Sequence, residues 1–179
     1  MLKSIMPLSA IISLRFFGLF IVLPVISVYA MQLHGATTTL VGIVVGGYAL
    51  TQMIFQIPFG IMSDKLGRKG TIIVGLILFG LGSILCAISN DILSLLLGRF
   101  MQGAGAIGAV VTAMISDLVK EEQRPKAMAM MGGSIAMAFA VSMILGPTLG
   151  AYLGVEFLFV LVSIIAFASI YVLIKMVPN

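Results

Sequence analysis

Long runs of hydrophobic residues alternate with short polar breaks along the whole chain. A helix needs about 20 apolar residues to cross the hydrocarbon core of a bilayer. Six runs of this length cover residues 6–31, 38–61, 70–89, 92–117, 126–150 and 155–176, with boundaries good to a few residues. The runs lack period-two alternation and are too long for barrel strands. The pattern predicts an all-α, polytopic membrane protein with six transmembrane helices, forming one bundle over residues 1–179.

The composition supports lipid as the solvent. Hydrophobic residues make up 61 % of the chain and charged residues 9 %, whereas a soluble domain is about half apolar and a quarter charged. The basic residues are too sparse to form a face for nucleic acid. No nucleophile–base pair, metal-ligand set or phosphate loop is recognisable, so we expect neither an enzyme nor a metal site. A G-x-G-x-x-G match at residues 103–108 lies inside a hydrophobic run, which excludes a dinucleotide site.

Lysine and arginine are distributed asymmetrically between the breaks. Eight of them lie in the two termini and in the second and fourth breaks: Lys3, Lys65, Arg68, Lys69, Lys120, Arg124, Lys126 and Lys175. The breaks around residues 32–37, 90–91 and 151–154 contain none. Basic loops stay on the cytoplasmic side. The distribution therefore predicts that both termini are cytoplasmic.

The first and fourth runs share a local pattern. Arg15 is followed by two phenylalanines and Gly18, and Arg99 is followed by Phe100 and, further on, by Gly103. The first run would enter the bilayer from the cytoplasm and the fourth from the outside. This relation predicts two three-helix repeats inserted with opposite topology, a common construction in secondary transporters.

The second break carries the densest motif, GIMSDKLGRKG over residues 60–70. Gly67 can supply the positive φ of a tight turn, and Gly60 would allow a neighbouring helix to approach closely. Asp64 is suited to a helix N-terminus, and Arg68 is a forked donor suited to a carboxylate. The alternative is an ordinary basic loop on the cytoplasmic side.

At these residues the chain resembles the major facilitator superfamily, whose signature G-x-x-x-D-(R/K)-x-G-R-(R/K) is matched by Gly60, Asp64, Lys65, Gly67, Arg68 and Lys69. The resemblance implies a cytoplasmic latch between two six-helix halves, in which the acid contacts a helix end of the other half. It also implies that Arg68 pairs with an acid at the end of the fourth span, where Asp117 stands. A network of Asp64, Arg68 and Asp117 is therefore expected.

Two further motifs resemble the drug/proton antiporter branch of this family. The run from Leu95 through Arg99, Gln102 and Gly103 to Gly105 resembles its fourth-span motif, which implies that Arg99 takes part in proton coupling. The alternative is an arginine that snorkels to the outer surface. The fifth run resembles the antiporter motif more weakly, and close helix packing is its alternative. The matching residues of the fifth run are Gly133, Gly146, Pro147 and Gly150.

Tyr48, Gln52 and Gln56 follow one another at four-residue spacing and so share one face of the second helix. Together with Arg15, Arg99 and Gln102 they are candidates for the lining of a central pathway. Hydrogen bonding between helices is the alternative. No Asp or Glu lies in the middle of a run, so the protonatable group of a proton-driven transporter is not evident.

The resemblance implies a bacterial inner-membrane transporter for proton-coupled efflux of small organic compounds by alternating access. The proton gradient would drive it without a cofactor. Such a fold has twelve helices, so a C-terminal six-helix half is expected as a partner, in the same longer chain, a separate chain or a second copy. The alternative is a half without transport activity of its own that serves assembly or regulation.

Overall fold

The computed structural model describes residues 2–177, with side chains from Ile5 onward. It consists of seven α-helices and a short 3₁₀ turn at Glu121–Gln123. The α-helices are α1 (Leu2–Met31), α2 (Thr38–Leu66), α3 (Arg68–Ala87), α4 (Ile92–Ala104), α5 (Gly108–Leu118), α6 (Arg124–Leu153) and α7 (Val155–Met176). Taken with α4 and α5 as one segment, these give six candidate membrane spans. The predicted all-α class and the six spans are confirmed.

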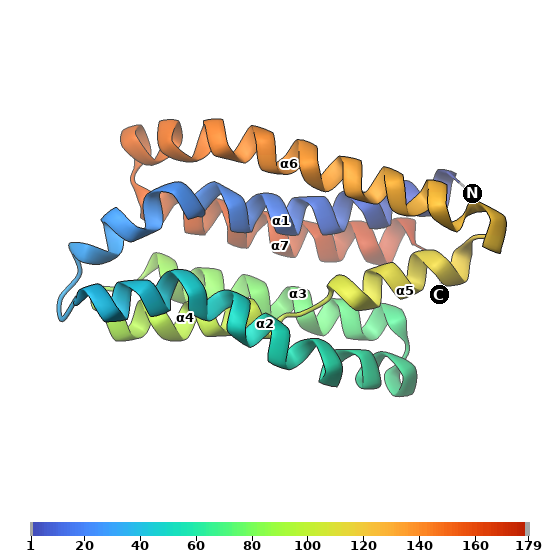
Figure 1. Ribbon diagram of the computed structural model, residues 1–179, viewed down its shortest axis with the longest axis horizontal. Coiled ribbons are helices and arrows are strands. Elements are labelled where there is room, and N and C mark those ends of the chain that lie inside the picture. Colours follow the sequence, from blue (N-terminus) through green and yellow to red (C-terminus); the bar gives the residue numbers. More distant parts are fainter. Residues whose placement is uncertain (1, 178–179) are drawn as a thin grey trace.

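The helices lie side by side along the long axis of the molecule, with α1, α6 and α7 in the upper half of Figure 1 and α2, α3 and α4 in the lower half. The most extensive packings join α1 to α6, α2 to α4, α3 to α4, α1 to α7 and α3 to α7. Exchanging spans one, two and three for spans four, five and six maps this set of pairs onto itself. The packing therefore has the symmetry that two inverted repeats require.

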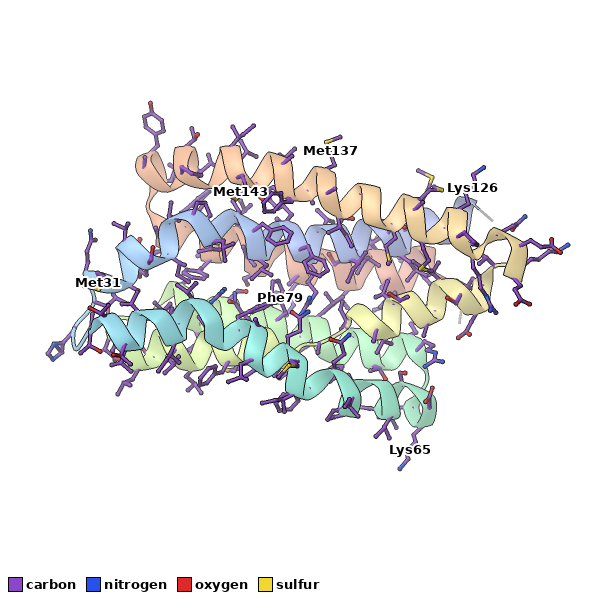
Figure 2. All side chains as sticks on the ribbon, viewed as in Figure 1. Met31, Lys65, Phe79, Lys126, Met137 and Met143 are labelled. Atoms are coloured by element: carbon purple, nitrogen blue, oxygen red, sulfur yellow. The ribbon has the colours of Figure 1, made fainter. Side chains whose placement is uncertain are left out.

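The basic breaks lie at one end of the bundle. Lys65 and Lys126 lie toward the right in Figure 2, whereas Met31 lies at the opposite end. Helix α1 begins and α7 ends at the right as well. The side chain of Lys3, which contributes to the predicted orientation, lies outside the described residues. This end is called the basic end below; that it faces the cytoplasm stays a prediction.

The fourth span is not one continuous helix, contrary to the expected run over residues 92–117. Helix α4 ends at Ala104 and α5 begins at Gly108. Between them the chain makes two tight turns, in which Ala106 N donates to Ala104 O at 2.8 Å and Ile107 N donates to Gly105 O at 2.9 Å. An added Cβ at Gly105 would overlap the backbone carbonyl of Gly75 on α3. The glycine therefore lets the interrupted segment lie directly against its neighbour.

Two hydrophobic clusters fill the interior and follow one another along the length of the helices. The first contains Ile21 and Ile26 of α1, and the second, nearer the basic end, contains Ile5 and Ile11 of the same helix. Arg15 lies between them in the sequence and is 1 % exposed. The two clusters thus meet at a buried polar layer near mid-height, and this layer holds the two arginines of the candidate site.

Candidate functional site

The turn between α2 and α3 forms the first part of the site. Gly67 separates the two helices with φ of +88°, a left-handed conformation that favours glycine. This turn reverses the chain so that the first residue of α3, Arg68, lies beside the last turn of α2. The positive φ expected at Gly67 is therefore found.

Arg68 joins three side chains from two helices. Its Nη1 donates to Asp64 Oδ1 at 2.7 Å and to Ser63 Oγ at 2.6 Å, and its Nε donates to Asp117 Oδ2 at 3.1 Å. The structure therefore brings Asp64, Arg68 and Asp117 together and fastens the turn to the end of α5. Sequence reasoning missed Ser63, although its place next to Asp64 was a usable signal.

The other motif residues are placed differently. Lys69 Nζ donates to the carbonyl oxygens of Val177 at 2.7 Å and Ile174 at 3.4 Å, where a cation meets the negative end of the α7 dipole. Lys65 is exposed. The close helix approach expected at Gly60 is not found within residues 2–177, because an added Cβ there would have no described atom within 4 Å. That face of α2 is open.

Arg15 is buried against the break in the fourth span. Its Nη2 donates to the carbonyl oxygen of Gly105 at 2.7 Å, just beyond the C-terminus of α4. A helix C-terminus carries a partial negative charge, so this contact supplies Arg15 with part of a counter-charge. Its Nε and Nη1 have no hydrogen-bond partner within the described part of the chain.

Arg99 is also buried, at 1 % exposure, which excludes the snorkelling alternative. Its Nε donates to Val44 O at 3.3 Å and its Nη1 donates to Gln102 Oε1 at 2.8 Å. Gln102 Nε2 in turn donates to Ser83 Oγ at 2.8 Å. Each partner of Arg99 is neutral, so the charge is held by dipoles alone. Ser83 of α3 was not predicted; a hydroxyl inside an apolar run was the available signal.

The ring of Tyr48 lies close to both arginines. The guanidinium carbon of Arg99 is 5.0 Å from its ring centroid and that of Arg15 is 5.9 Å from the same point. The two cations are thus at most about 11 Å apart, so two unit charges at these positions repel by at least about 1.5 kcal/mol at an effective dielectric constant of about 20. Attraction to the aromatic face offsets part of this repulsion.

A groove of about 380 Å³ opens beside this layer. Four of the residues expected to line a pathway, Tyr48, Gln52, Gln56 and Arg99, line this groove, and its remaining lining is apolar. Arg15, Gln102 and Gly103 are not among its lining residues; Arg15 and Gln102 are buried within the bundle. The face of α2 that carries Tyr48, Gln52 and Gln56 therefore lines a groove, and Arg99 lines the same groove.

Glycines set the distances between the helices that carry these groups. A Cβ at Gly103 would overlap Tyr48 O and Thr51 Oγ1 of α2, and a Cβ at Gly82 of α3 would lie 2.7 Å from the carbonyl oxygen of Gly98. The crossing of Gly82 and Gly98 was not predicted, although glycines inside spans commonly mark such crossings.

The residues of the fifth-span motif lie in three different environments. A Cβ at Gly146 would overlap the carbonyl oxygen of Ile21 on α1, so α6 and α1 touch there. Gly150 and Pro147 line a separate pocket nearer the end opposite the basic end. A Cβ at Gly133 would meet no described atom within 4 Å. Close packing therefore accounts for Gly146 and gives no reason for a glycine at position 133.

A family model described as the Major Facilitator Superfamily matches residues 8–179. The chain is 48 % identical over 172 residues to the inner membrane transport protein YajR of Escherichia coli, covering 96 % of this chain and 38 % of YajR. It is 37 % identical over 154 residues to the quinolone resistance protein NorA of Staphylococcus aureus, covering 84 % of this chain and 38 % of NorA. The chain thus spans well under half the length of these relatives.

Solved structures show the same fold. The POT family transporter PepTSo superposes with a TM-score of 0.82 at 18 % identity, covering 94 % of this chain and 36 % of PepTSo. The human organic anion transporter MFSD10 superposes with a TM-score of 0.72 at 19 % identity, covering 98 % of this chain and 47 % of MFSD10. Fold and relatives together define an integral bacterial membrane protein of the transporter class, not an enzyme. The chain belongs to the major facilitator superfamily.

Proposed function

We propose that this chain is one six-helix bundle of a proton-coupled secondary transporter that exports small organic compounds by alternating access. It lies in the bacterial inner membrane with its basic end and both termini in the cytoplasm. A second six-helix bundle completes the pathway. The observation that carries the proposal is the placement of the Asp64–Arg68–Asp117 network at the basic end, with the groove of Tyr48, Gln52 and Arg99 lying deeper in the bundle.

The network has the properties of a latch. Arg68 holds the turn to α5, while the Asp64 side chain remains 70 % exposed. An exposed carboxylate held in place by an arginine can accept hydrogen bonds from the N-terminus of a helix in the second bundle. Opening the basic end would break that contact, while the hydrogen bonds inside this bundle persist. The role of Asp64 is therefore to contact the partner, and the role of Arg68 is to position it.

The cargo and the coupling ion follow from the relatives and the groove. The names of YajR and NorA associate them with inner-membrane transport and quinolone resistance. A largely apolar groove with a few polar groups suits an amphipathic organic molecule. All acidic residues lie at the ends of spans or in loops, so the proton carrier is Asp117 or an acid of the second bundle. An acid of the second bundle that lies next to Arg99 would bind its proton less tightly because of that positive charge.

The test is export of a fluorescent quinolone from proteoliposomes with an imposed pH gradient. The chain is reconstituted alone and together with the C-terminal six helices of YajR. Export is expected only with the second bundle and only with the gradient. Asp64→Asn and Arg99→Ala should slow it strongly, whereas Lys126→Gln, which removes an exposed charge, should not.

Two results would contradict the proposal. Full export by the chain alone, shown to be monomeric, would refute the need for a second bundle. Unchanged export by both Asp64→Asn and Arg99→Ala would refute the assigned sites. If the paired bundles assemble but transport none of a panel of quinolones and other amphipathic compounds, the remaining interpretation is a membrane module for assembly or regulation.

A further inference from the structure

The strongest unexplained feature outside the latch is the charge of Arg99. This side chain is 1 % exposed, and its Nη2 has neither solvent contact nor a hydrogen-bond partner within residues 2–177. Its other donors reach a backbone carbonyl and an amide oxygen, both neutral. A buried cation ordinarily has an anionic partner, because burial without one costs a large part of its hydration energy.

No acidic residue of this chain can supply that partner. The acids all lie in loops or at helix ends: Asp64, Asp91, Asp117, Glu121, Glu122 and Glu156. The ion pairs found within the described residues involve Arg68 alone. Arg15 faces the same tyrosine ring and adds a second positive charge, only part of which the α4 terminus offsets. The polar layer therefore carries an uncompensated positive potential.

Further hydrogen-bonding capacity lies unused beside Arg99. The hydroxyl of Tyr48 and Oε1 of Gln52 are buried and have no partner in the described structure. Of these two, only the hydroxyl can donate to an anion, because the amide oxygen is an acceptor. Both residues line the 380 Å³ groove together with Arg99. A tyrosine hydroxyl can donate to a carboxylate, and an arginine next to it can bind the same group with a charge-assisted hydrogen bond.

The rest of the groove is apolar. Phe16, Leu19 and Leu23 of α1 and Val45 of α2 face it, and its volume falls within the range of small-molecule sites, about 300–1,000 Å³. An inorganic anion would leave this surface without a partner. An organic acid with a compact hydrophobic body would cover the apolar side chains, and a rotation of the buried Tyr48 side chain would admit its carboxylate to Arg99.

We propose that the groove binds monocarboxylates with an apolar body, through Arg99 and the Tyr48 hydroxyl. This proposal rests on the proposed transport function, because it specifies the chemical class of the cargo. Binding of the acid supplies the missing counter-charge, so an occupied site is electrostatically more favourable than an empty one. A neutral amide or a cationic amine of the same size as the acid would not supply this counter-charge.

The experiment measures binding to the purified full chain in detergent by titration calorimetry at neutral pH. Benzoate is the probe, and benzamide and benzylamine are its neutral and cationic counterparts. Benzoate should bind at least about tenfold more tightly than either, a difference equivalent to about 1.4 kcal/mol. Sodium chloride at the same concentration should not compete; equal competition would overturn the assignment to organic acids.

Two variants and a matched control locate the binding. Arg99→Gln should abolish the preference for benzoate over benzamide. Tyr48→Phe keeps the ring next to both arginines and removes only the hydroxyl, so it should fold and bind benzoate several-fold more weakly. Lys126→Gln removes one exposed positive charge at the basic end and should bind benzoate as the unmodified chain does.

The outcomes separate this proposal from the transport proposal. Benzoate binding no tighter than benzamide binding, or binding unchanged in Tyr48→Phe, would overturn the carboxylate site, even if quinolone export is observed. If Arg99→Gln does not fold, the Tyr48→Phe result decides. Benzoate binding in a reconstituted pair of bundles that exports nothing would count against transport and would leave the site standing.

Discussion

Replacing Gly103 by alanine tests whether the distance between α2 and α4 is set by a missing side chain. The added Cβ would overlap Tyr48 O and Thr51 Oγ1, and it would lie 3.1 Å from Thr51 Cβ. The carbonyl oxygen belongs to the α2 backbone and cannot rotate away, so the two helices must separate. Such overpacking typically costs about 1–3 kcal/mol.

The matched control is Gly46→Ala. Gly46 lies on the same helix as Tyr48, but a Cβ there meets no described atom within 4 Å. Alanine in a helix is favoured over glycine by about 0.5–1 kcal/mol, a gain that applies to both variants. We therefore expect Gly103→Ala to lower the free energy of unfolding by about 1–2 kcal/mol and Gly46→Ala to raise it slightly.

The chain provides its own reporter for this comparison. It has no tryptophan and one cysteine, Cys86, which is buried. A thiol-reactive dye added during heating therefore labels the protein as it unfolds. For a chain of this size 1 kcal/mol corresponds to a shift of about 2–4 °C in the unfolding midpoint. Equal midpoints for Gly103→Ala and Gly46→Ala would refute the argument from helix contact.

Three further predictions concern the ends of helices. Arg68→Gln should lower the free energy of unfolding by no more than about 1 kcal/mol per ion pair, and the loss should shrink at high salt in the same labelling assay; a loss that does not depend on salt would contradict an ionic role. Lys69→Met removes the hydrogen bonds to the carbonyl oxygens at the end of α7, so it should speed hydrogen exchange in the last turn of that helix, measured by mass spectrometry. The same substitution at the exposed Lys65 should not. The backbone N–H of Ser94 donates to the Asp91 carboxylate at 2.7 Å and, as the largest cause, lowers the pKa of Asp91. The stabilisation from Asp91 should therefore be present above the ordinary pKa of aspartate and disappear as the pH falls through the lowered pKa. In thermal melts followed by circular dichroism, the Asp91→Ala variant should lose less stability on acidification than the unmodified chain.

The sequence predicted the spans well because lipid imposes one simple requirement on all of them. Each break lies within a few residues of its predicted place, since most charged residues gather outside the hydrocarbon core and mark the ends of the spans. The interruption at residues 105–107 was not predicted. The Gly105–Ala106–Ile107 stretch is as apolar as its surroundings, and the groups that contact the break, Arg15 of α1 and Gly75 of α3, are ones that hydropathy does not connect with it.

Parts of the candidate site were predictable for a related reason. The motif with fixed spacing contains Asp64 and Arg68, and the resemblance of this motif to the major facilitator superfamily implied their network with Asp117 in advance of the structure. The contact of Lys69 with Val177 depends on where α7 ends, and the proximity of Arg15 to Arg99 depends on how the two repeats pack. Such contacts are set by the tertiary arrangement, and residue types do not reveal it.

The contact of Arg15 with the break in the fourth span has a consequence for biosynthesis. An arginine in the middle of an isolated membrane helix disfavours insertion by about 2.5–3.5 kcal/mol. The carbonyl that accepts its hydrogen bond is made 90 residues later, in the span with the lowest hydropathy of the six, 1.3. The first span is apolar enough to be a membrane span in spite of this cost. Its arginine gains the hydrogen bond to Gly105 only after two further spans have been made, so the burial of this charge is completed late in the assembly of the bundle.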